Sequence, residues 1–468
     1  MLESGKALYW FLSPVLFTGF LLWSFLIKRS FLRESLFLIF ILGITFFYSL
    51  VLLQVPLGLI VVYFQITAIV FPFGLAYLVY KRRQQFVDNH HYIFTSLFIL
   101  ILGLILVWPI VKFIIYDPII AWDARSIWYF RAKQICFNNG FSKDIGLCSV
   151  GCPTSFSHSA YPILMPSIGA FMCKCAGYWN EYLPKNNLLV LICGMFFAFF
   201  SLRHLHVLVR LAIFFCLLAI NPYMHLNGYL DSWLGVYVAL TLVFLCEYIR
   251  IGQRSYFYTF LCSLIFICYI KNEGTFLSLC MITITILSLL AGKPRQYLRH
   301  TAIKIWKAKY LISFTAIPYL LWAYHKKHLD LHEIDYDFSV LTEPDLWKNF
   351  FLSDKYFMMH DFIVQKSDYI GLYCSCLVVI GLSLLTYKIQ KFNRIEFRNA
   401  FLILCIPLLT CLLFYFGICI VYYSSLIDLE WHLATSADRL REHMVYMSLI
   451  SFIYAISLVK VKMKFVFD

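Results

Sequence analysis

The segment 116–128 holds residue types that are well suited to chemistry at a membrane surface. Asp117 and Asp123 follow directly on a long apolar run, and Trp122 lies between them. Tryptophan favours the membrane–water interface, so we expect both carboxylates at that depth. A carboxylate there can take a proton from a hydroxyl or hold a divalent cation. The alternative is an aromatic belt with a helix-capping aspartate.

The residues that follow, 124–137, mix basic and apolar side chains. Arg125, Arg131 and Lys133 alternate with residues such as Ile127 and Trp128. This pattern predicts a helix that lies flat in the headgroup layer. Its cations could meet a lipid phosphate there.

Three further segments carry ionisable residues at the ends of apolar runs. Lys271 and Glu273 lie in a short turn between two runs, where charges are costly unless they are paired or used. They form either a local ion pair or part of a phosphate site. Asp231 opens an apolar helix, as a cap or as a functional acid. Arg439 and Arg441 enter the last run, and their side chains either rest among headgroups or bind phosphate through the forked guanidinium.

Membrane-spanning helices must position these segments. The chain has 468 residues, of which 62% are hydrophobic and 14% charged, whereas soluble domains have about 25% charged residues. So much apolar surface excludes a soluble enzyme, a disordered protein and a coiled coil, and the long apolar runs exclude an outer-membrane barrel. Apolar stretches of spanning length begin near Trp10, Ser35, Leu57, Tyr92, Asn187, Leu211, Ser232, Tyr256, Thr275, Tyr310, Tyr369, Ala400 and His443. We predict an all-α, polytopic bundle of about 13 transmembrane helices, with juxtamembrane helices in the first large outer loop.

Lys and Arg concentrate in the short loops on one side of this bundle. The strongest such loop, 292–309, holds six basic residues and no acid. The positive-inside rule makes this side cytoplasmic. The N-terminus is then outside, the C-terminus is cytoplasmic, and the segments described above face outward. Topology thus explains the net charge of +14, and we expect no nucleic-acid partner.

Five segments occur in a characteristic order: Trp122-Asp123-Ala124 through Ser126-Ile127-Trp128 to Ala132-Lys133, Tyr161-Pro162, Gly228-Tyr229 with Asp231, Lys271-Asn272-Glu273-Gly274, and Leu433 to Arg439. This ordered set resembles bacterial members of the GT-C superfamily. These are multi-spanning glycosyltransferases similar to the protein mannosyltransferases and to the aminoarabinose transferase of lipid A. The resemblance covers roughly residues 92–454. It implies a GT-C-like catalytic core at 89–468, preceded by accessory transmembrane helices at 1–88.

The resemblance also implies roles for the acids. In that superfamily an acidic residue of the first outer loop of the core acts as the base, or as a metal ligand in some branches. Asp123 matches that place, with Asp231 and Glu273 as supporting acids that position the substrate or a cation. Ala124 stands where many members have a second acid. The sequence therefore requires no cofactor, and a divalent metal ion at Asp123 is left as an alternative.

The basic residues are implied to hold the phosphate of the donor. The sugar donor of the superfamily is a polyprenyl-phosphate sugar, and transfer typically inverts the anomeric centre. Lys271 and Arg439 carry over first as phosphate-binding residues, and Arg125 and Arg441 follow. The absence of a P-loop, a GxGxxG motif and an HExxH motif agrees with a donor that needs no nucleotide.

The sequence therefore predicts an integral membrane glycosyltransferase, multi-pass in a bacterial inner membrane, with its active site on the outer face. It would transfer a hexose or pentose from a polyprenyl-phosphate donor to a glycan, lipid or protein acceptor of the cell envelope. Surrounding membrane lipids complete its expected partners. The residues leave three alternatives open: a transporter or flippase of lipid-linked sugars, a polymerase or ligase of such sugars, and a structural subunit.

Overall fold

A computed structural model shows how the chain folds. It describes residues 2–27, 33–81, 90–142, 158–220, 222–290, 302–331, 339, 350–364, 370–389, 394–426 and 428–460. Within these ranges the regular elements are helices, and there is no β-strand. The α-helices are α1 (Leu2–Ile27), α2 (Leu36–Leu52), α3 (Leu57–Lys81), α5 (His90–Tyr116), α6 (Phe130–Phe137), α7 (Leu164–Ala176), α8 (Asn186–Ser201), α9 (Val207–Ala219), α10 (Pro222–Leu226), α11 (Asp231–Ile251), α12 (Arg254–Ile270), α13 (Glu273–Leu290), α15 (Lys309–His328), α17 (Asp354–Val364), α18 (Ile370–Ile389), α19 (Arg394–Tyr423) and α20 (Leu429–Lys460). Shorter turns are η1 (Arg33–Ser35), η2 (Ala124–Tyr129) and η4 (Leu183–Lys185), of which η2 is π-helical.

The apolar stretches predicted from the sequence all fall on helices, from α1 at the N-terminus to α20. Several outer helices expose apolar side chains, such as Ile69 and Phe73 of α3 and Ile105 of α5. An extended apolar exterior fits a lipid environment. Within the described ranges, five helices are long and apolar enough to cross a membrane: Leu2–Ile27, Leu57–Gly74, Leu183–Ser201, Asp231–Ile251 and Phe397–Tyr423. The all-helical, membrane-type fold is confirmed, while the total of about 13 spans stays a prediction.

The first three helices pack onto the rest of the bundle. Helix α2 contacts α8, α12 and α15, and α1 and α3 both contact α7. Gly43 of α2 permits a close approach to α1, because a Cβ on it would lie 1.9 Å from the carbonyl oxygen of Val15. The predicted boundary between 1–88 and 89–468 falls within 82–89, outside the described residues.

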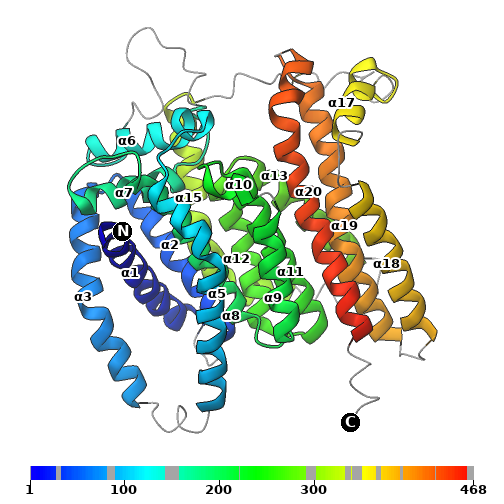
Figure 1. The fold of residues 1–468 in the computed structure, drawn as a ribbon, viewed down its shortest axis with the longest axis horizontal. Coiled ribbons are helices and arrows are strands. Elements are labelled where there is room, and N and C mark those ends of the chain that lie inside the picture. Colours follow the sequence, from blue (N-terminus) through cyan, green and yellow to red (C-terminus); the bar gives the residue numbers. More distant parts are fainter. Residues whose placement is uncertain are drawn as a thin grey trace.

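Helices α6 and α7 lie across one end of the bundle, as Figure 1 shows. They are the helices expected in the first large outer loop, between α5 and α8. The sequence places Arg131 among lipid headgroups, but in the structure this side chain is fully buried. Its Nε and Nη1 atoms donate to the carbonyl oxygens of Ile127 (2.9 Å) and Tyr161 (2.5 Å). That prediction was wrong for Arg131 because the side chain points into the protein to hold the next loop.

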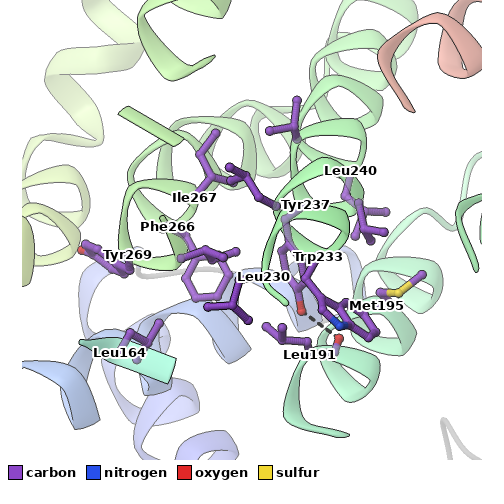
Figure 2. Packing of buried hydrophobic residues seen from close by; sticks show 14 of the residues in the cluster. Leu164, Leu191, Met195, Leu230, Trp233, Tyr237, Leu240, Phe266, Ile267 and Tyr269 are labelled. Atoms are coloured by element: carbon purple, nitrogen blue, oxygen red, sulfur yellow. Dashed lines mark hydrogen bonds between the residues drawn. The ribbon is translucent and has the colours of Figure 1, made fainter. Parts of the chain in front are cut away.

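The core of the bundle fixes the beginning of α11. Figure 2 shows Trp233 and Tyr237 of α11 beside Leu191 and Met195 of α8. The Tyr237 hydroxyl donates to the Leu191 carbonyl at 2.8 Å, and its ring centroid lies 5.3 Å from that of Phe266. These contacts hold the first two turns of α11, and so they hold the ionisable residue that opens this helix.

Helices α11 and α20 approach each other closely. A Cβ on Gly235 of α11 would lie 2.3 Å from Cδ2 of Tyr446 of α20. The Tyr446 hydroxyl in turn donates to the Ile220 carbonyl at 3.1 Å. The absence of a side chain at Gly235 therefore lets the two helices bring their functional residues together.

Candidate functional site

Five ionisable side chains from separate parts of the chain meet at one end of the bundle. They are Asp123, Asp231, Lys271, Glu273 and Arg439, and we call them the charge cluster. Asp123 lies just before η2, Asp231 opens α11, Lys271 and Glu273 flank the turn from α12 to α13, and Arg439 belongs to α20. The end of the bundle that carries them is the end where α6 lies (Figure 1).

Lys271 and Asp231 form the inner pair of the cluster. Nζ of Lys271 lies 2.7 Å from Oδ1 of Asp231 and 2.7 Å from Oε1 of Glu273. The Lys271 and Asp231 side chains are only 8% and 3% exposed. Burial acts to lower the pKa of Lys271, but the Asp231 and Glu273 carboxylates outweigh it and raise that pKa above its usual value. The ammonium group is therefore held charged.

The structure does not support the interpretation of Asp231 as a helix cap. Leu230, not Asp231, is the capping residue of α11, and no side-chain capping hydrogen bond is present there. The Asp231 carboxylate instead accepts from Lys271. For Lys271 and Glu273 the local ion pair is present, but it belongs to a larger network that crosses the bundle.

Arg439 and Asp123 form the outer pair. Nη1 of Arg439 is ion-paired with the Asp123 carboxylate and lies 3.8 Å from Oδ2 of Asp231. The two side chains of the outer pair are 20% and 22% exposed, so a ligand can reach them more readily than the inner pair. The Arg439 guanidinium also lies over the Tyr229 ring, 5.3 Å from its centroid, and its buried Nε has no partner among the described residues.

Tyr161 is a member of the site to which the sequence assigned no role. Its hydroxyl donates to Oε1 of Glu273 at 3.4 Å, and Nζ of Lys271 lies 5.4 Å from its ring centroid. Arg131 holds the backbone carbonyl of Tyr161 in place. The Tyr161-Pro162 motif was the available signal, because it belongs to the ordered set. The second Glu273 oxygen, Oε2, is buried without a partner in the described part of the chain.

Gly228 allows the turn that contains it to pack closely against the segment that follows Asp123. Its φ is +93°, in the region that favours glycine. A Cβ there would lie 2.8 Å from Cε2 of Tyr129 and 2.9 Å from Cβ of Ala124. The Tyr129 hydroxyl donates to Oδ1 of Asn187 at 3.1 Å, which ties η2 to α8. π-Helical turns of this kind are frequent at functional sites.

Two neighbours of the cluster on α20 also lacked an assigned role. The Ser232 hydroxyl donates to the buried carboxylate of Glu442. His443 is fully buried, its Nδ1 lies 3.3 Å from the Leu440 carbonyl, and its Nε2 has no partner among the described residues. Both residues follow Arg439 on the same helix, and only the tertiary fold places them beside α11.

Arg125 and Arg441 stand apart from the cluster. Arg125 is exposed on η2. Arg441 is ion-paired with Asp438, and its Nη1 lies 3.5 Å from the Phe362 carbonyl of α17. Neither arginine pairs with the acids of the cluster within the described residues, so their predicted contacts with phosphate remain predictions. Asp117 also lies outside the cluster, and its backbone carbonyl accepts from Lys185 at 2.9 Å.

The composition of the cluster sets its chemistry. Three carboxylates face two cations, so the cluster carries a surplus of negative charge. Among the described residues no group of three or more His, Cys, Asp or Glu side chains has the arrangement of a metal site. The partly exposed Arg439, with a buried Nε that lacks a partner among the described residues, suits an anionic group. The partly exposed carboxylates suit a hydroxyl or a cationic group.

No family model, curated protein or solved structure matches this chain. The functional interpretation therefore depends on the site geometry and on the ordered motifs.

Proposed function

We propose that the protein is an integral membrane glycosyltransferase that moves a sugar from a polyprenyl-phosphate donor to a glycan, lipid or protein of the cell envelope. One observation carries the proposal. Asp123, Lys271 and Arg439 come from three of the ordered motifs, and they meet in one partly exposed charge cluster. A base beside phosphate-binding cations is what transfer from a lipid phosphate needs.

The cluster offers a group for each part of the transfer. The acceptor hydroxyl attacks the anomeric carbon of the donor sugar and gives its proton to Asp123. The bond between that carbon and the phosphate oxygen breaks, and its electron pair stays on the phosphate. Arg439 and Lys271 stabilise the charge that collects there. The products are the glycosylated acceptor and the polyprenyl phosphate, and the resemblance implies inversion at the anomeric carbon.

A bundle of about 13 spans in a bacterial inner membrane accompanies this proposal, with the cluster on the outer face. The described basic residues support that orientation. Arg203 follows α8, and Arg250 and Arg254 flank the turn from α11 to α12. Helix α11 begins at the cluster, so its last turn and Arg250 lie at the other end of the bundle. Positive charge at that end favours a cytoplasmic location, with the C-terminus cytoplasmic and the N-terminus outside.

The proposal is tested by mass spectrometry of lipid-linked and envelope glycans in cells lacking the protein. We expect one polyprenyl-phosphate sugar to accumulate and one acceptor to lose one sugar. Wild type should restore the glycan, whereas Asp123→Asn should behave as the deletion. Asp117→Asn is the matched control, because the same change is made in the same segment outside the cluster, and it should restore the glycan.

Two results would count against the proposal. Full restoration by Asp123→Asn would remove this carboxylate from the catalytic step. Unchanged glycans, or lipid-linked intermediates that shift between leaflets while Asp123 is dispensable, would favour a transporter.

A further inference from the structure

The outer pair joins the two residues whose proposed roles require them to be apart. Asp123 would take a proton from the acceptor, and Arg439 would hold the donor phosphate. In the structure these two side chains are ion-paired with each other. The carboxylate oxygen that contacts Arg439 must leave the guanidinium before it can contact an acceptor hydroxyl. The inference below depends on the proposed function and asks how this pair is opened.

Burial separates the cluster into a fixed part and a reachable part. The inner pair is almost fully buried, and Lys271 holds Asp231 at 2.7 Å. The outer pair is about one-fifth exposed on both sides. A ligand that approaches the cluster therefore meets Arg439 and Asp123 before it meets Lys271.

Arg439 has hydrogen-bonding capacity that Asp123 does not use. A guanidinium carries five N–H donors, and its contacts to both acids are made through Nη1. The buried Nε of Arg439 has no partner among the described residues. Buried polar atoms without a partner are rare in proteins and call for an explanation. A phosphate, which accepts from two guanidinium nitrogens at once, would supply the missing partner.

The charge of the cluster means that an arriving phosphate must compete with a carboxylate. Three acids already face two cations, so a further anion is favourable only where it replaces one of them at a cation. Asp231 is held by Lys271 and stays 3.8 Å from Arg439. Asp123 has Arg439 as its ion-pair partner within the described residues and lies in the turn before η2. Asp123 is therefore the acid that a phosphate can displace from Arg439.

We propose that the donor phosphate displaces Asp123 from Arg439, so that the carboxylate is released to the acceptor hydroxyl only when the donor is bound. The released carboxylate then lies beside a phosphate. Donor binding thus frees Asp123 to act as the base, and the donor binds before the acceptor is activated.

The test measures the binding of farnesyl phosphate to the purified full-length protein in detergent, with farnesol as the ligand that lacks the phosphate. Asp123→Asn removes the competing carboxylate and keeps the side-chain shape. We expect it to bind farnesyl phosphate about five- to tenfold more tightly than wild type, as expected for the loss of about 1 kcal/mol of competition. We expect the same increase in affinity for Asp123→Ala. Arg439→Gln should bind at least about tenfold more weakly, as expected for the loss of a bidentate contact.

Glu273→Gln is the control matched in charge. It removes one negative charge from the same cluster but leaves the outer pair intact. If the phosphate displaces Asp123, the affinity for farnesyl phosphate should increase less in Glu273→Gln than in Asp123→Asn. Equal gains would show that net charge alone governs binding, and this would overturn the displacement.

The other outcomes separate the inference from the proposed function. Equal or weaker binding by both Asp123 variants, with binding lost in Arg439→Gln, overturns the displacement and leaves the phosphate site standing. If wild type and all variants bind farnesyl phosphate no better than farnesol, the phosphate site of the proposed function is wrong, and the displacement fails with it.

Discussion

The inner pair predicts a large and specific effect of replacing Lys271. Lys271→Met removes the ammonium and keeps an unbranched side chain of similar length. It leaves Asp231, whose side chain is 3% exposed, with Arg439 at 3.8 Å as its nearest remaining cation. Removing one partner of a buried ion pair costs about 3–5 kcal/mol. Because Arg439 keeps part of the interaction, we expect the free energy of unfolding to fall by about 3 kcal/mol.

The assay is an SDS titration of the protein in mild detergent, followed by tryptophan fluorescence. Lys133→Met is the matched control, because Lys133 is exposed on α6 at the same end of the bundle. It should change the free energy of unfolding by no more than about 0.5 kcal/mol. The double variant Lys271→Met, Asp231→Leu should recover most of the loss, since an apolar replacement of a whole buried pair is nearly neutral. It should still be inactive.

Two results would refute this reasoning. If Lys271→Met is as stable as Lys133→Met, the inner pair is not buried in the folded protein. If the double variant is no more stable than Lys271→Met, the loss does not come from an unpaired Asp231.

Three further predictions concern the surroundings of the cluster. Gly228→Ala should lower the free energy of unfolding by about 2–3 kcal/mol and abolish activity, because backbone strain and overpacking add. Gly252 has a φ of +76° and open space around it, so Gly252→Ala should lower the free energy of unfolding by only about 1 kcal/mol. The SDS titration measures both variants. Tyr161→Phe should keep its stability to within about 1 kcal/mol, but should transfer sugar more slowly in a kinetic assay, because Glu273 loses a donor. The pKa of Lys271 is raised in the folded protein, so the charged ammonium stabilises the fold at every pH below the unfolded-state pKa of about 10.4. This stabilisation is lost only as the pH rises through the pKa of Lys271 in the folded protein. The stability difference between wild type and Lys271→Met should therefore stay constant from about pH 6 to about pH 9, and a difference that shrinks within this range would refute the pairing.

The helices were predictable from the sequence because lipid demands long apolar runs with satisfied backbone groups. Each predicted stretch is helical within the described residues. The apolar runs did not determine how many of these helices cross the membrane. Among the described residues, five helices meet the length and composition of a span, and others, such as α9 with 13 residues, are shorter.

The members of the cluster were predictable, and so was the local pair of Lys271 and Glu273, but the pairs that cross the bundle were not. The ordered motifs identified Asp123, Asp231, Lys271, Glu273 and Arg439 one segment at a time. That Arg439 pairs with Asp123 follows from the close packing of helices far apart in the sequence, for which no local pattern exists.

The partners of two buried side chains could not be predicted from their neighbours in the sequence. Arg131 has the same surroundings in the sequence as an interfacial arginine, yet the fold turns it inward to hold Tyr161. Asp231 stands where a helix cap is expected, yet its carboxylate pairs across the bundle with Lys271. In both cases a tertiary contact replaced the interaction that local sequence favours.

The most direct test of the central claim follows the donor with purified protein. Wild type, Asp123→Asn and Arg439→Gln are each incubated in detergent with a membrane lipid extract from cells lacking the protein, and mass spectrometry follows the polyprenyl lipids. We predict that wild type converts one polyprenyl-phosphate sugar into polyprenyl phosphate while one acceptor gains that sugar, and that neither variant does so. No conversion by wild type, or equal conversion by all three proteins, would contradict glycosyl transfer at the charge cluster.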